Sequence, residues 1–218
     1  MEGYDFHIHS IFSDGELIPA EIAHRCSVLG YKAIAITDHA DNSNLEFILS
    51  NLVDACAELS EHMYTKILPG IEITYAPAGM LEKLVSRARE LGAKVILVHG
   101  ETPVEPVPEG TNAVAVEIAE VDILAHPGFI TRKEAEQALE NNIYLELSAR
   151  RGHSLANGHV ARIAQETGAK LLVNTDAHSP EDLIPPSKAI EIATASGLPE
   201  ELSKIITSVN PKSFIGDL

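Results

Sequence analysis

The stretch that decides the fold is AIAITDH, Ala33–His39, in which small and β-branched apolar residues run directly into an aspartate and a histidine. A short apolar run of this kind is typical of a buried strand, and polar functional side chains gather where such a strand gives way to a loop. The same order recurs in KVILVH, DILAHP and LLVNTDAH, which bring His99, His126, Asp176 and His178. The chain therefore repeats one local design, a buried strand followed by histidine or carboxylate.

Short β-rich runs alternate with helix-periodic segments along all 218 residues. This alternation is typical of βα units around a parallel sheet, and the length suits one α/β domain spanning 1–218. We expect strands at Tyr4–Ile8, Ala33–Thr37, Ile67–Thr74, Lys94–Val98, Val121–Ala125, Ile143–Ser148 and Lys170–Thr175. We expect helices near 18–29, 44–64, 79–92, 112–119, 131–141 and 157–168, and a further helical stretch from about 187 to 208, in which Pro199 starts the last helix.

Composition limits the partners and the compartment. The 32 acidic and 16 basic residues give a formal charge of -16, which argues against long nucleic acid and anionic membranes as partners. Cys26 and Cys56 lie in helix-like stretches and are expected to be small buried residues rather than a disulfide. The N-terminal MEGYDFHIHS lacks the apolar run of a signal peptide, and no later run suits a membrane helix. We expect a cytoplasmic protein, and the sequence leaves its oligomeric state open.

The histidines are concentrated at strand ends. His7 and His9 are two residues apart on an expected strand, so both side chains project from the same face. Glu72 lies near the end of the third expected strand, and in a parallel barrel all these ends share one face. Imidazole and carboxylate ligands without thiolate suit zinc, manganese or iron. The number of candidates exceeds the four ligands of a closed zinc site, which favours two or three divalent ions with open positions.

These motifs resemble the PHP family, the polymerase and histidinol phosphatase domain of phosphoesterases, and the resemblance covers essentially the whole chain. It implies a distorted seven-stranded (β/α)7 barrel that hydrolyses phosphate esters with up to three metal ions. It also implies three sets of ligands: His7, His9, Glu72 and Asp176 for one ion, Glu72 bridging to His99 and His126 for a second, and Asp14, His39 and His178 for a third. Some relatives have a histidine in place of Asp14.

Such a centre would hydrolyse the ester by attack of a metal-bridging hydroxide, with Glu72 as the bridging ligand. Asp38 and His178 are candidates to transfer a proton to the leaving group. An alternative role for Asp38 is to orient His39 from behind.

Two loops are expected near the site. Arg150, Arg151 and His153 follow the sixth strand and are candidates to bind the substrate phosphate, since family members commonly have a basic residue in this region. The Pro-rich segment ETPVEPVPEGT, 101–111, either borders the site or is a surface connection. Glu101 and Glu146 either line the pocket or have solvated or orienting roles, whereas His24, His62 and His159 are expected to be surface or partly buried residues.

The leading function is hydrolysis of a small phosphorylated substrate, either a phosphomonoester such as histidinol phosphate or a nucleotide. One alternative is a metal-dependent amidohydrolase, because those enzymes also place histidines at the strand ends of a barrel. Another is a non-catalytic binding or scaffold module on the same barrel, as in the ribonuclease P subunit related to this fold. The complete ligand set favours an enzyme.

Overall fold

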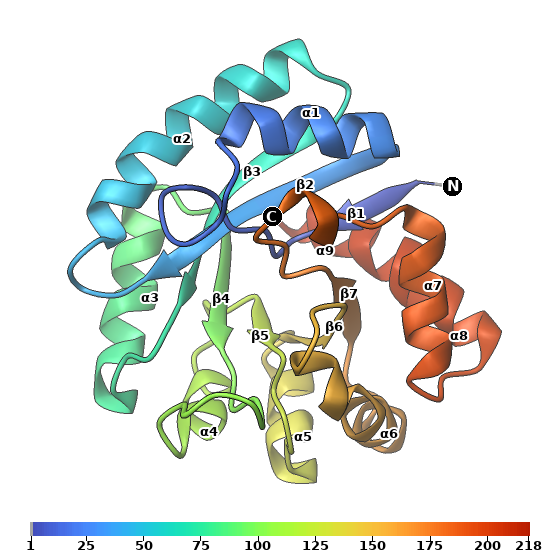
Figure 1. The fold of residues 1–218 in the computed structure, drawn as a ribbon. Coiled ribbons are helices and arrows are strands. Elements are labelled where there is room, and N and C mark those ends of the chain that lie inside the picture. The colour runs from blue at the N-terminus through green and yellow to red at the C-terminus, as the bar shows by residue number, and fades with distance from the viewer. Residues whose placement is uncertain (1) are drawn as a thin grey trace.

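The computed structural model describes residues 2–218. Within them, seven parallel strands form one sheet in chain order, which confirms the predicted parallel α/β architecture. The strands are β1 (Gly3–Asp5), β2 (Tyr31–Ala40), β3 (Lys66–Ile73), β4 (Val95–His99), β5 (Ile123–Ala125), β6 (Tyr144–Ser148) and β7 (Leu171–Asn174). The sheet curls into a nearly closed barrel with helices around it (Figure 1).

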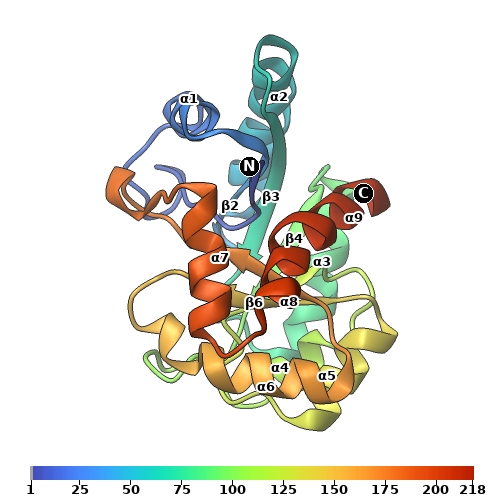
Figure 2. The same ribbon diagram turned by 90° about the vertical axis from the view of Figure 1, so that its right-hand side faces the viewer.

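Six helices connect successive strands: α1 (Pro19–Leu29), α2 (Leu45–His62), α3 (Leu81–Glu90), α4 (Thr111–Ala115), α5 (Arg132–Glu140) and α6 (Asn157–Thr167). After β7 come α7 (Pro186–Ala195), α8 (Glu200–Lys204) and α9 (Asn210–Asp217), which pack together on one side of the molecule (Figure 2). Single turns of 3-10 helix lie at Ala78–Met80, His153–Ala156 and Pro180–Asp182, and a π turn lies at Ile205–Val209. None of the helices in the described part of the chain is long and apolar enough to span a membrane.

The helical stretch expected from about 187 to 208 contains more than one helix, and a new helix follows Pro199, as predicted. The first of its helices, α7, ends at Ala195, where Gly197 adopts a φ of 91° and Pro199 precedes the start of α8. A glycine in the left-handed region followed by proline stops a helix, because the first reverses the chain and the second cannot donate the next hydrogen bond. The chain then remains helical beyond 208, through α9.

Two smaller expectations also differ. The first strand ends at Asp5 rather than Ile8, which forms only an isolated bridge with Ala177. The helix expected at 112–119 is the short α4. Cys26 and Cys56 are buried free thiols on α1 and α2, as expected.

The barrel interior is apolar toward the amino ends of the strands, which we call its lower part. Successive side chains of a strand point to opposite faces, so every second residue enters the barrel. Leu97 of β4 and Tyr144 of β6 belong to a buried interior group that includes Phe214 of α9. The Phe214 ring lies 4.7 Å from the Phe6 ring and 5.3 Å from the Tyr144 ring, so α9 closes this end of the barrel.

The next inward positions along the same strands are polar. His99 follows Leu97 by two residues and Glu146 follows Tyr144 by two; on β3, Glu72 follows Leu68 of the apolar group by four. All three are buried. The interior therefore changes from apolar to acidic and histidine-rich toward the carboxyl ends of the strands.

Side chains close the gap between β1 and β7. The Asp5 carboxylate, which is fully buried, accepts hydrogen bonds from the backbone N–H and the hydroxyl of Thr175. The Phe6 N–H donates to Asn174 Oδ1 at 3.0 Å, and the His9 N–H donates to the Ala177 carbonyl at 2.9 Å. These bonds replace a strand ladder and hold the first and last ligand-bearing segments together.

We predict that Thr175→Val lowers the free energy of unfolding of the metal-free protein by about 1–3 kcal/mol, because the buried Asp5 carboxylate loses a hydroxyl donor. Urea denaturation followed by circular dichroism in the presence of a chelator measures this. The matched control is Thr194→Val, since the Thr194 hydroxyl donates to the Ile190 carbonyl of its own helix. If both variants unfold at the same urea concentration, the Thr175 hydroxyl does not contribute to joining β1 to β7.

Candidate metal centre

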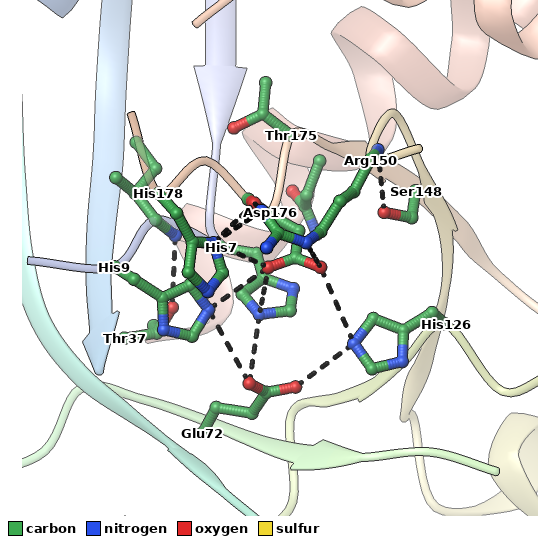
Figure 3. Close-up of polar contacts among 12 residues, drawn as sticks. His7, His9, Thr37, Glu72, His126, Ser148, Arg150, Thr175, Asp176 and His178 are labelled. Atoms are coloured by element: carbon green, nitrogen blue, oxygen red, sulfur yellow. Dashed lines mark hydrogen bonds and ion pairs between the residues drawn. The ribbon is translucent and has the colours of Figure 1, made fainter. Parts of the chain in front are cut away.

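Side chains that follow the first strand of the sheet meet side chains that follow the last strand, and they converge on Glu72 and Asp176 (Figure 3). His7 Nε2 lies 3.3 Å from Glu72 Oε2 and 3.6 Å from Asp176 Oδ1. His9 Nε2 lies 3.6 Å and 3.2 Å from the same two oxygens. The two histidines thus point to one place, as their spacing predicted, although they lie just beyond β1 rather than on it.

The other oxygens of these two carboxylates face His126. Its Nε2 lies 3.3 Å from Glu72 Oε1 and 3.8 Å from Asp176 Oδ2. Glu72 and Asp176 are both buried. Each carboxylate therefore runs between two groups of imidazoles and offers one oxygen to each, which is the arrangement required of a bridging ligand.

A further group lies at the open side. His178 Nε2 is 3.3 Å from Asp14 Oδ1, and His39 Nε2 is 3.6 Å from Asp14 Oδ2. The Asp14 side chain is 54% exposed. Burial opposes ionisation of Asp14, but the imidazoles of His178 and His39 lower its pKa to about 2.

Among residues 2–218, four groups of side chains offer ligand atoms that lie within 4.8 Å of one another. They are His9 with Asp14, His39 and His178; His7 with Glu72 and His126; His7 with His9 and Asp176; and His126 with His153 and Asp176. Eight of the nine predicted ligands belong to them. The ninth, His99, lies at the edge of the cluster, where its ring is 4.5 Å from that of His126.

The side chains present fit divalent cations. His7 Nε2 and both ring nitrogens of His9 are buried and have no hydrogen-bond partner among the described residues. A buried polar atom without a partner costs about 1–3 kcal/mol, and several that converge on carboxylates are satisfied together by a metal ion. Burial also holds the pKa of His9 well below its usual range, which leaves the ring neutral as metal ligation requires.

The chain matches the family model described as "PHP domain" over residues 5–143. The chain belongs to the PHP domain family. It is 49% identical over 196 residues to "Uncharacterized protein MJ1295" of Methanocaldococcus jannaschii, covering 89% of this chain and 90% of that one. The PHP match ends before Asp176 and His178, so the structure, rather than the match, brings these two residues to the centre.

Two other relatives have named functions. The chain is 29% identical to "DNA polymerase/3'-5' exonuclease PolX" of Bacillus subtilis, a match that covers 82% of this chain but only 35% of PolX. It is 27% identical to "Ribonuclease P protein component 3" of Methanosarcina barkeri, covering 97% of this chain and 88% of that one. The PHP fold is therefore shared by proteins with different named roles.

The centre of this PHP protein has a buried supporting acid, Glu146. Its carboxylate lies 2.8 Å from His7 Nδ1 and accepts hydrogen bonds from the His126 N–H and from Asn174 Nδ2, each at 2.9 Å. Burial raises the pKa of Glu146, but the His7 imidazole outweighs it and lowers the pKa to about 2. Of the roles that the sequence left open, Glu146 has the orienting one.

Asp38 has a different place from the one expected. Its carboxylate accepts hydrogen bonds from the N–H and hydroxyl of both Ser10 and Ser13. The His39 Nδ1 lies instead 2.8 Å from the Thr74 hydroxyl and 2.9 Å from Glu72 Oε2. Adjacent strand residues point to opposite faces, so Asp38 is directed away from His39. It anchors the loop that carries Asp14 and is not oriented for proton transfer in the cluster.

The basic residues after β6 are separated by the structure. Arg150 Nη1 donates to the Asp176 carbonyl at 3.1 Å, and its Nε lies 3.8 Å from Asp176 Oδ2. Arg151 is exposed, and its side chain has no hydrogen bond or ion pair within the described chain, so a role for it in substrate binding stays a prediction. His153 is buried beside Asp176.

Sequence reasoning missed Glu105 as a site residue. The Pro-rich loop borders the centre and brings Glu105 Oε2 to 3.1 Å from His99 Nε2 and Oε1 to 3.4 Å from His153 Nε2. The Tyr75 hydroxyl donates to the same carboxylate at 3.0 Å. Glu101 instead accepts a hydrogen bond from the Asn112 N–H within the loop. The remaining histidines, His24, His62 and His159, lie outside the four groups.

Backbone strain coincides with two of the candidate ligands. His126 has a φ of 26° and Asp176 a φ of 55°, in the left-handed region that non-glycine residues rarely adopt. Such conformations cost on the order of 1–3 kcal/mol and persist where the surrounding structure enforces them, commonly at functional sites. The strain supports a functional reason for placing these two side chains.

We predict that Glu146→Gln weakens zinc or manganese binding about 10- to 100-fold, because neutralising the acid behind a metal-binding imidazole removes its orientation and basicity. Isothermal titration of the chelator-treated protein measures the affinity. The control is Glu166→Gln, an exposed carboxylate that pairs with Arg162 on α6. Unchanged affinity in Glu146→Gln would show that Glu146 does not support a metal ligand.

Proposed function

We propose that this PHP protein is a metal-dependent phosphoesterase that acts on a small phosphorylated substrate. The observation that carries the proposal is the pair of buried carboxylates, Glu72 and Asp176, each shared between two groups of imidazoles. Shared carboxylates are suited to hold neighbouring divalent ions. When bound, such ions activate water and neutralise charge on the phosphoryl oxygens.

The ligand assignment proposed here follows the family resemblance. His7, His9, Glu72 and Asp176 would hold one ion; Glu72, His99 and His126 a second; and Asp14, His39 and His178 a third. Zinc, manganese and iron all suit this donor set of imidazole and carboxylate. We assign His178 to metal binding rather than to proton transfer, because its Nε2 faces Asp14 within the outer group.

We assign substrate phosphate binding to Arg150. The guanidinium contacts Asp176 on one side, and the side chain remains 31% exposed. A planar guanidinium can offer paired donors to phosphate oxygens, whereas the Asp176 carboxylate beside it is buried. Arg150 therefore stands where a phosphate that reaches the centre would meet a positive side chain.

The chain's charge favours a small substrate. At -16, the protein as a whole repels a long polyanion, so attraction to phosphate would come from bound cations and Arg150 rather than from a basic surface. A phosphomonoester or a nucleotide meets this condition.

A second candidate is a subunit of an RNA-processing assembly, favoured by the similarity to ribonuclease P component 3 along 97% of the chain. The acidic balance would direct such a subunit to contact protein rather than RNA. The buried ligand groups have no use in that role, which is why we place hydrolysis first.

We predict that the manganese- or zinc-loaded protein releases phosphate from a member of a panel of histidinol phosphate, other phosphomonoesters and nucleotides, and that a chelator abolishes release. Oligonucleotides and simple amides complete the panel. Activity confined to amides would replace the proposal with an amidohydrolase. Metal-loaded protein that is inactive throughout but co-purifies with an RNA-processing complex would favour the second candidate.

We further predict that Arg150→Ala raises KM for the active substrate by about 10- to 100-fold, because a charge-assisted contact to phosphate contributes roughly 1.5–3 kcal/mol. Steady-state kinetics with the same metal measure this. Arg151→Ala is the matched control, since it removes the same charge from the neighbouring exposed position. Equal KM values in the two variants would remove Arg150 from substrate binding.

A further inference from the structure

His153 occupies a buried place that its position in a loop did not suggest. It is the first residue of the 3-10 turn His153–Ala156, which follows β6, and is only 4% exposed. A side chain that binds substrate at the mouth of a barrel is open to solvent, as Arg150 is. His153 instead lies at the depth of the candidate ligands.

One ring nitrogen of His153, Nδ1, is within hydrogen-bond distance of a threonine hydroxyl outside the ligand groups. Nδ1 lies 2.7 Å from the Thr102 hydroxyl. His7, a ligand implied by the family resemblance, is oriented in a comparable way, because its Nδ1 lies 2.8 Å from the Glu146 carboxylate. When Nδ1–H donates to the threonine, Nε2 carries the free lone pair, and this is how proteins orient histidines that bind metals.

The other nitrogen of His153 points into the centre. Nε2 lies 3.7 Å from Asp176 Oδ2, the same oxygen that lies 3.8 Å from His126 Nε2. The ligand atoms of His126, His153 and Asp176 all lie within 4.8 Å of one another. Two ligands bound about 2.1 Å from one ion are themselves roughly 3–4 Å apart, so these spacings match one coordination sphere.

The two imidazoles are also arranged as a pair. The rings of His126 and His153 lie parallel, with centroids 4.1 Å apart and an interplanar angle of 19°. His99, which the family resemblance assigned beside His126, is outside the four ligand groups, and its Nε2 lies 3.1 Å from Glu105. His126 therefore has two imidazole neighbours, His99 and His153, and only His153 shares a ligand group with it and Asp176.

We propose that His153 is itself a metal ligand, completing with His126 and Asp176 the ion that Glu72 bridges. This inference rests on the proposed metal centre and extends it by a residue that the family resemblance does not supply. Glu105 Oε1 lies 3.4 Å from His153 Nε2, so the Pro-rich loop lies beside this proposed ion site.

The test compares metal binding rather than turnover. Chelator-treated wild-type protein, His153→Ala and His159→Ala are dialysed against zinc, and bound zinc per chain is measured by plasma mass spectrometry, with dissociation constants from titration. His159 is the matched control because it lies six residues further on and its Nε2 is within 2.7 Å of the Ile130 carbonyl, outside the cluster. We expect His153→Ala to lose one equivalent of zinc, or to bind it at least tenfold more weakly.

Two further variants show whether any loss of zinc in His153→Ala comes from the missing ligand or from a misfolded protein. Thr102→Val leaves the His153 imidazole in place, and we expect it to weaken the same zinc equivalent about 10- to 100-fold. His153→Asp offers another ligand atom and is expected to recover part of the binding that His153→Ala loses. Circular dichroism of each variant reports the fold.

The outcomes separate the two proposals. Full zinc content and affinity in His153→Ala, with a raised KM for the substrate, would make His153 a substrate-binding residue and overturn the inference alone. Wild-type protein that binds no metal would overturn both the inference and the proposed function. Loss of zinc in His153→Ala, with His159→Ala unchanged, supports the inference whatever the substrate proves to be.

Discussion

The structure depends on how the protein accommodates the Glu72 carboxylate inside the barrel. A buried carboxylate is tolerated only where opposite charge and hydrogen bonds compensate for the water it has lost. Burial would raise its pKa, but the surrounding imidazoles, with His7 foremost, hold the pKa well below the usual range. Further buried acids, Asp176 and Glu146, lie in the same region. Divalent ions would balance this density of negative charge, since close-packed imidazoles cannot all be protonated without repelling one another.

The same constraint explains why the barrel interior has two layers. Every second side chain of a strand points into the barrel. The inward positions near the amino end of a strand form the apolar lower layer, and those near its carboxyl end form the polar upper layer. Phe214 on α9 fills the lower layer, which excludes water from beneath the acids. The side-chain bonds of Asp5 and Asn174 to the opposite segment then place the ligands after β1 beside those after β7. The apolar residues that stabilise the barrel and the residues of the candidate metal centre thus lie at different depths in its interior.

Much of this could be predicted because the signals were local and periodic. Buried strands that run into histidine or carboxylate place their ends on one face, which is enough to bring eight of the nine predicted ligands together. Asp38 was misjudged because its neighbour His39 suggested a shared role, although adjacent strand residues face opposite sides. The Pro-rich loop was a candidate to border the site, but Glu105 could not be singled out within it, since such a loop lacks periodicity and its path depends on tertiary contacts. Pro199 was a local signal for a helix start, whereas the continuation of the helical stretch beyond 208, through α9, was not predicted.

The central claim is that the buried histidines and acids form a multinuclear metal centre. Anomalous X-ray diffraction from crystals soaked in zinc, recorded above and below the zinc absorption edge, tests it most directly. The account predicts two or three anomalous peaks among the four ligand groups, at least one of them between Glu72 and Asp176, each about 2.0–2.2 Å from imidazole nitrogens and carboxylate oxygens. Crystals with no anomalous peak in the barrel, in which these side chains are bonded only to water and to one another, would contradict it.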